Sequence, residues 1–133
     1  MIKFLTAYAV VTIVMVALDL LWLGVIAKPI YQQGIGHLMA DKPNVLAAVL
    51  FYALFAAGLV VFAVVPNADD AGGRNTLVAG ALFGFFAYAT YDLTNLATLK
   101  NWPIGMSILD IAWGSFVSLI SAAAGKFALE RWH

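Results

Sequence analysis

The chain has 133 residues, of which 64% are hydrophobic and only 11% are charged, whereas about 25% of the residues in a typical soluble domain are charged. The formal net charge is zero, so we expect no nucleic acid as a partner. The lack of cysteine excludes disulfides, thiolate metal sites and cysteine nucleophiles. Because the hydrophobic residues come in long blocks, the composition predicts an integral membrane protein.

Four apolar blocks predict four membrane-spanning helices, because each approaches or exceeds the roughly 20 residues that cross a bilayer. The prolines all lie outside these blocks or at their start, which leaves the backbone donors of every helix interior intact. We therefore predict an all-α fold, a four-helix bundle that forms one transmembrane domain over residues 1–133. Its helices are expected at residues 4–27, 45–65, 76–99 and 104–129.

The first block is longer than the 7–15-residue apolar core of a secretory signal peptide. No clear small-x-small cleavage site follows it. We therefore expect residues 4–27 to stay in the protein as the first spanning helix.

The three connections differ in length and composition. The first, residues 28–44, is polar and long enough to carry a short interfacial helix or a flap. The second, residues 66–75, has the composition of a plain turn. The third, residues 100–103, is so short that it predicts antiparallel packing of the last two helices.

The distribution of positive charges predicts the orientation. Four basic residues fall on the side of the N terminus and three on the other side, a bias that places both termini in the cytoplasm. The first set is Lys3, Arg74, Lys126 and Arg131, and the second is Lys28, Lys42 and Lys100.

Three aspartates lie inside the apolar blocks: Asp19, Asp92 and Asp110. A carboxylate at the centre of a membrane helix costs about 2.5–3.5 kcal/mol on insertion scales and marks a candidate functional site. Asp19 and Asp92 come near the ends of helices that run in the same direction, and Asp110 comes near the start of a helix that runs the opposite way. The topology therefore predicts that all three carboxylates lie in one leaflet, which we expect to be the outer one.

The helical spacing places further side chains with the carboxylates. Residues Gly80, Gly84, Tyr88, Asp92 and Asn95 share one face of the third helix. The first two form a GxxxG pair that lets another helix approach closely. That face should therefore point into the bundle and carry Asp92 inward.

A faint 2+2 repeat accompanies this pattern, since Asp19 and Asp92 occupy matching places in their helices. It predicts that the bundle is built from two repeated helical hairpins. The residues expected to bind a ligand are Asp19, Asp92, Asp110, Asn95, Tyr88, Tyr91, Trp22 and Trp113.

Three neighbouring carboxylates in a medium of low dielectric constant cannot all ionise cheaply, and no basic residue is expected beside them. Either one of them holds a proton or a cation joins them. The three aspartates form an all-oxygen ligand set, which suits a hard cation such as Na⁺, Mg²⁺ or Ca²⁺. No other cofactor is expected. A pair of carboxylates can alternatively serve as general acid and base, or only tie helices together.

The run FGFFAYATYDLTNLATLKNWP, followed seven residues later by Asp110 and then by Trp113-Gly114, resembles a family of bacterial membrane proteins known as domain of unknown function 2177. The resemblance continues through Asp19–Gly24, the Tyr31…Gly36 segment and Phe51-Tyr52, so it covers essentially the whole chain. It implies a multi-pass protein of the bacterial inner membrane with four helices. It implies no particular activity.

The sequence is compatible with three functions. The first is a small transporter or binding protein that holds a cation, a proton or a small polar ligand at the carboxylates, and such a short chain is expected to form a homodimer. The second is a membrane-embedded enzyme that acts on a lipid-like substrate. The third is a non-catalytic accessory subunit in which the carboxylates set helix register. Membrane lipid is a partner in all three.

Overall fold

The computed structural model describes residues 2–131 and contains only helices and their connections over that range. Four helical segments are long and apolar enough to cross a membrane, which confirms the predicted all-α membrane protein. Their ends lie within a few residues of the predicted ones. The four spans are Ile2–Ile26, Val45–Asn67, Arg74–Thr98 and Ile104–Arg131.

The first two spans change helical geometry near their C-terminal ends, whereas the last two are regular α-helices. Each change is a π-helical turn, which widens the helix locally and alters the direction of the side chains that follow. The first span consists of α1 (Ile2–Leu21) and η1 (Trp22–Ile26), and the second consists of α3 (Val45–Leu59), η3 (Val60–Val64) and the 3₁₀ turn η4 (Val65–Asn67). The last two are α4 (Arg74–Thr98) and α5 (Ile104–Arg131).

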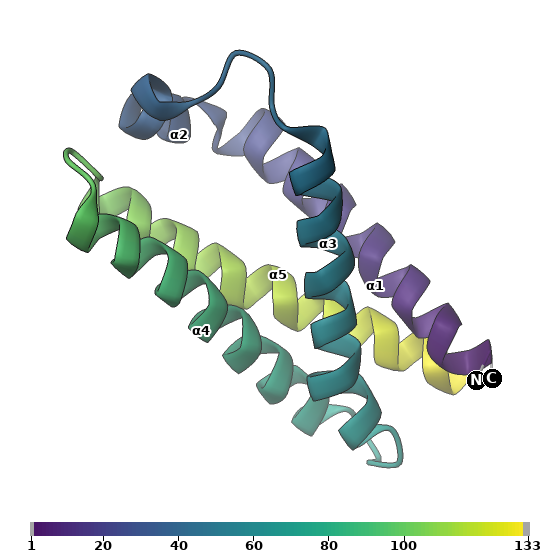
Figure 1. Cartoon of the computed structure of the whole chain (residues 1–133). Helices are drawn as coiled ribbons and strands as arrows, with labels where there is room; N and C mark the ends of the chain where they lie inside the picture. Colours follow the sequence, from purple (N-terminus) through teal and green to yellow (C-terminus); the bar gives the residue numbers. More distant parts are fainter. Residues whose placement is uncertain (1, 132–133) are drawn as a thin grey trace.

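Helices α4 and α5 form a close antiparallel pair (Figure 1), as their short connection predicted. Glycines on α4 make the close approach possible. A Cβ atom on Gly80 would lie 2.8 Å from the Cβ atom of Ala122, and one on Gly84 would overlap the backbone of Gly114. Any larger side chain would therefore push the two helices apart, so the predicted packing role of the GxxxG pair is confirmed.

Helix α1 also packs against α5, and α3 packs against α1. Helix α4 packs against the C-terminal part of the second span, η3, and the two segments separate toward the start of α3 (Figure 1). Aromatic rings of Phe55, Phe83 and Tyr88 line the widening gap, with ring centroids 5.1–6.0 Å apart. The bundle is therefore tight at one end and open at the other.

The first connection forms a short helix, α2 (Lys28–Ile35), followed by the 3₁₀ turn η2 (Gly36–Leu38). In Figure 1, α2 lies at the same end of the bundle as the connection between α4 and α5. The first turn of α1 and the last turn of α5 lie together at the opposite end. The two hairpins therefore differ, because an additional helix separates α1 from α3 whereas α4 and α5 are joined directly.

The second connection is more than a plain turn, because a lysine from α5 holds it in place. Lys126 is only 2% exposed, and its ammonium group donates to the carbonyl oxygens of Asn67 at 2.8 Å, Ala68 at 3.2 Å and Asp70 at 2.8 Å. These carbonyls end the second span, where a cation is favoured by the helix dipole. Sequence reasoning placed Lys126 among the charges of the cytoplasmic side and missed this contact.

Candidate functional site

The three membrane aspartates come from three different helices, and all are at least 92% buried at the end of the bundle that α2 covers. The structure therefore brings them to one end of the bundle, as the hairpin topology indicated. Their surroundings differ sharply, however. Asp19 and Asp110 accept hydrogen bonds from other side chains, whereas Asp92 does not.

Asp19 on α1 is fully engaged in holding helices together. Its Oδ2 atom accepts a hydrogen bond of 2.8 Å from the hydroxyl of Tyr52 on α3, and its Oδ1 atom accepts one of 2.8 Å from the indole N–H of Trp113 on α5. Hydrogen bonds to a charged group are the stronger ones in proteins. Asp19 thus joins three spans and has both oxygen atoms satisfied.

Asp110 on α5 ends a short hydrogen-bond chain that reaches out of the membrane spans. Its Oδ1 atom accepts a bond of 2.7 Å from the hydroxyl of Tyr31 on α2, and that hydroxyl accepts one of 3.1 Å from the indole N–H of Trp22. Burial raises the pKa of the Tyr31 hydroxyl, so this group stays protonated and remains a donor. The chain fixes α2 against the bundle.

Asp92 on α4 is the exception. Its side chain is fully buried, and neither of its carboxylate oxygens has a hydrogen-bond partner among the residues that the structure describes. Its neighbour is Asp110, which is close enough for the two carboxyl groups to share a hydrogen bond when one of them holds a proton. A buried polar group without a partner costs free energy and calls for an explanation such as a ligand, an ion or a water molecule.

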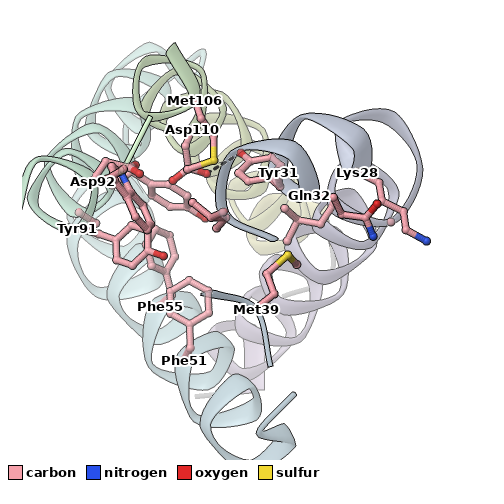
Figure 2. A pocket seen from close by; sticks show the side chains of 16 residues that line it. Lys28, Tyr31, Gln32, Met39, Phe51, Phe55, Tyr91, Asp92, Met106 and Asp110 are labelled. Atoms are coloured by element: carbon pink, nitrogen blue, oxygen red, sulfur yellow. Dashed lines mark hydrogen bonds between the residues drawn. The ribbon is translucent and has the colours of Figure 1, made fainter. Parts of the chain in front are cut away.

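Asp92 and Asp110 line a cavity of about 550 Å³ that lies between the open ends of α3 and α4 and beneath α2 (Figure 2). This volume is within the range of small-molecule sites, and a mostly apolar wall with a few polar groups is their usual character. The polar lining residues are Lys28, Tyr31, Gln32, Tyr88, Tyr91, Asp92 and Asp110, and the others are Leu23, Gly24, Ile35, Met39, Phe51, Phe55, Ala87, Trp102 and Met106.

The residues predicted as one ligand-binding group separate into two sets. Tyr88, Tyr91, Asp92 and Asp110 line the cavity. Asp19, Asn95, Trp22 and Trp113 are not among its lining residues. The two tryptophans instead position the carboxylates, because each donates its N–H to one of the hydrogen-bond chains described above.

Sequence reasoning missed three residues that the structure brings to the carboxylates or to the cavity. In the sequence, Tyr52, Tyr31 and Trp102 stand out only as part of the resemblance to a family, which implies no role for them. Trp102 is 7% exposed and lines the cavity, and its indole N–H has no hydrogen-bond partner within the described residues. Helical spacing could not find them, because Tyr52 and Tyr31 lie on helices other than those of the carboxylates they contact, and Trp102 lies in the connection between α4 and α5.

The aspartates do not form a three-ligand cation site. Among residues 2–131, no group of three or more histidine, cysteine, aspartate or glutamate side chains is arranged to hold a metal ion. The physical reason is visible in the contacts, since Asp19 points its oxygens at Tyr52 and Trp113 and not at the cavity. Protein ligands for a hard cation in this cavity would therefore be Asp92 and Asp110, with Asp19 excluded.

Comparison with known proteins identifies a family and nothing more specific. No curated protein and no solved structure matches the chain significantly. One family model, described as a predicted membrane protein, covers residues 4–127. With nearly its whole length matched, the chain belongs to this membrane protein family, domain of unknown function 2177.

Proposed function

We propose that this protein is a small binding or transport protein that holds a cation, a proton or a small polar ligand at Asp92 and Asp110, within the membrane. The observation that carries the proposal is the Asp92 side chain, which is fully buried and lines a cavity of about 550 Å³, and whose oxygen atoms have no hydrogen-bond partner among the described residues. A carboxylate kept in such a place is costly, and a function is the default explanation.

The contrast with Asp19 supports the assignment. Asp19 has two donors and joins three helices, which is the behaviour of a structural polar residue. Asp92 accepts no hydrogen bond from a tyrosine or tryptophan within the described residues, and its neighbour is another carboxyl group, Asp110. A purely structural role therefore accounts for Asp19 but leaves Asp92 without an explanation.

We further place the protein in the bacterial inner membrane with both termini in the cytoplasm. The positive charges at the end where α1 begins and α5 ends support this orientation. In that orientation the cavity lies in the outer leaflet, beneath the interfacial helix α2. A transporter of this length would work as a homodimer, since four spans leave little material for alternating access.

A membrane enzyme acting on a lipid-like substrate is the second candidate. It is favoured by the apolar cavity wall and by Phe51 and Tyr91, two lining residues that are 42% and 54% exposed and give the cavity a side facing the hydrocarbon. Asp92 and Asp110 would then act as acid and base. Identical lipid profiles in deletion and wild-type cells would count against this candidate.

Thermal unfolding of the purified protein in detergent tests the binding function. The melting temperature is measured with Na⁺, Mg²⁺ and Ca²⁺, with a panel of small polar ligands and over a range of pH. A ligand that binds only the folded state raises the melting temperature in a saturable way. The rise should disappear in Asp92→Asn and Asp110→Asn and persist in Asp41→Asn, a control at an exposed aspartate of the first connection. A rise that is unchanged in Asp92→Asn would disprove the proposed site.

A further inference from the structure

The wall of the cavity combines negative charge with aromatic rings. Asp92 and Asp110 lie on one side, and the rings of Tyr88, Tyr91 and Phe55 also line it. Lys28 is the one basic residue among the lining residues, and Figure 2 shows its side chain extending away from both carboxylates. Carboxylates together with the faces of aromatic rings are the groups that bind an organic cation.

Two buried polar groups on this wall lack hydrogen-bond partners within the described residues, and they have opposite requirements. Asp92 needs donors, and the indole N–H of Trp102 needs an acceptor. A metal ion would satisfy Asp92 but could not accept a hydrogen bond from Trp102. A ligand with an ammonium group and a neighbouring hydroxyl would satisfy both groups.

The remainder of the cavity is suited to an apolar chain. Ile35, Met39 and Phe51 are apolar lining residues, and Figure 2 shows Met39 and Phe51 on the side away from Asp92. Phe51 is 42% exposed. Helices α3 and α4 separate at this level, so a hydrocarbon chain could leave the cavity toward the lipid. The polar groups and the apolar wall together describe an amphiphile with its head at the carboxylates.

We propose that the cavity binds an amphiphilic amine, and specifically a long-chain amino alcohol whose ammonium group contacts Asp92 and Asp110 and whose hydroxyl accepts the N–H of Trp102. This inference rests on the proposed binding function and names its ligand class. Tyr88 and Tyr91 flank the ammonium group, and the alkyl chain lies along Phe51 toward the gap between α3 and α4.

Four probes of equal chain length test the ligand class: 2-aminodecan-1-ol, decylamine, decan-1-ol and decanoate. Each is titrated into the full chain in a maltoside detergent, and the melting temperature is recorded. The amino alcohol should give a saturable rise of several degrees, the amine a smaller one, and the alcohol and the carboxylate none. Equal rises with the amine and the alcohol would overturn the inference, because they would show that charge is not recognised.

Substitutions assign the rise to particular atoms. Asp92→Asn and Asp110→Asn should each abolish the response to both amines, whereas the exposed-site control Asp41→Asn should keep it. Trp102→Phe should remove only the advantage of the amino alcohol over decylamine, since it deletes the N–H and keeps the ring. An advantage that survives Trp102→Phe would disprove the role of the hydroxyl.

The outcomes separate this inference from the proposed function. A rise with Na⁺, Mg²⁺ or Ca²⁺ that depends on Asp92, without any rise from the amines, would overturn the amino alcohol and leave the binding function in place. The absence of a rise with every cation, polar ligand and amine would overturn both.

Discussion

The indole rings of Trp22 and Trp113 stack with their centroids 4.5 Å apart and their planes only 4° from parallel. They come from the end of the first span and from α5, and their N–H groups serve different carboxylates. Trp113 donates to Asp19, whereas Trp22 donates to the Tyr31 hydroxyl that in turn donates to Asp110. One stacked pair thus positions two hydrogen-bond chains.

Trp113→Phe should lower the free energy of unfolding by about 1 kcal/mol, because it keeps an aromatic ring in the stack but removes one donor of Asp19. A double-mutant cycle with Asp19→Asn, measured by denaturant unfolding in detergent micelles, isolates the hydrogen bond. The two substitutions should be non-additive by a similar amount. Additive effects would show that the Trp113 N–H does not stabilise the protein through Asp19.

Asp19→Asn and Asp92→Asn should change stability in opposite directions in the absence of ligand. The first replaces an oxygen that accepts a hydrogen bond with an amide that cannot accept, so it should cost about 1–3 kcal/mol. The second removes a buried carboxylate that has no partner in the described structure, so the melting temperature should stay the same or rise. A loss for Asp92→Asn as large as that for Asp19→Asn would contradict this assignment.

Tyr31→Phe should loosen α2 from the bundle without unfolding the spans. It removes the hydrogen bond to Asp110, which tethers α2 to α5. Amide hydrogen exchange in α2 should become about tenfold faster, as the loss of about 1.4 kcal/mol implies. Gln33→Ala is the matched control, since Gln33 lies on the same helix and is exposed. Equal exchange rates in the Tyr31 variant and the wild type would show that the tether does not hold α2.

Gly84→Ala should destabilise the bundle by about 1–3 kcal/mol, because the added methyl group would overlap Gly114 and Ser118 of α5. Gly105→Ala is the control, since a Cβ atom on Gly105 meets nothing within 4 Å. It should be neutral or slightly stabilising through helix propensity. Unfolding curves of the two variants and the wild type, recorded under the same conditions, test both expectations. Equal stability of the two variants would show that α4 and α5 are less closely packed than described.

Lys126→Met should cost about 2 kcal/mol, because it leaves three carbonyl groups at the end of the second span without their shared donor. Lys42→Met, at an exposed position of the first connection, should have little effect. Protease cleavage between residues 66 and 75 should become faster in the first variant only. An unchanged cleavage rate would show that Lys126 does not hold this connection.

Much of the fold could be predicted from local patterns. The length of the apolar blocks sets the four spans, because a helix must satisfy its own backbone groups across the bilayer. The brief connection at residues 100–103 leaves no choice but an antiparallel pair, and the Gly80–Gly84 spacing indicates which face of α4 packs. That the three aspartates lie at a common end of the bundle also follows from topology alone.

The grouping of the site could not be predicted in the same way. Asp19, Asp92 and Asp110 cannot be distinguished from the sequence, since each is an aspartate in an apolar helix. Their different surroundings arise from Tyr52, Trp113 and Tyr31, which lie on other elements at sequence separations of 33, 94 and 79 residues from the carboxylates they contact. Helical periodicity relates residues three or four positions apart, so it cannot predict contacts over such separations.

The sequence by itself therefore determined the class of protein, the number of spans and the end of the bundle at which the carboxylates lie, because these depend on hydrophobic length and chain direction. Only the tertiary structure decided which carboxylate accepts hydrogen bonds and which has no hydrogen-bond partner among the described residues. That distinction depends on how the helices rotate and separate when they pack. Because α3 and α4 separate at this end, Asp92 lines a cavity.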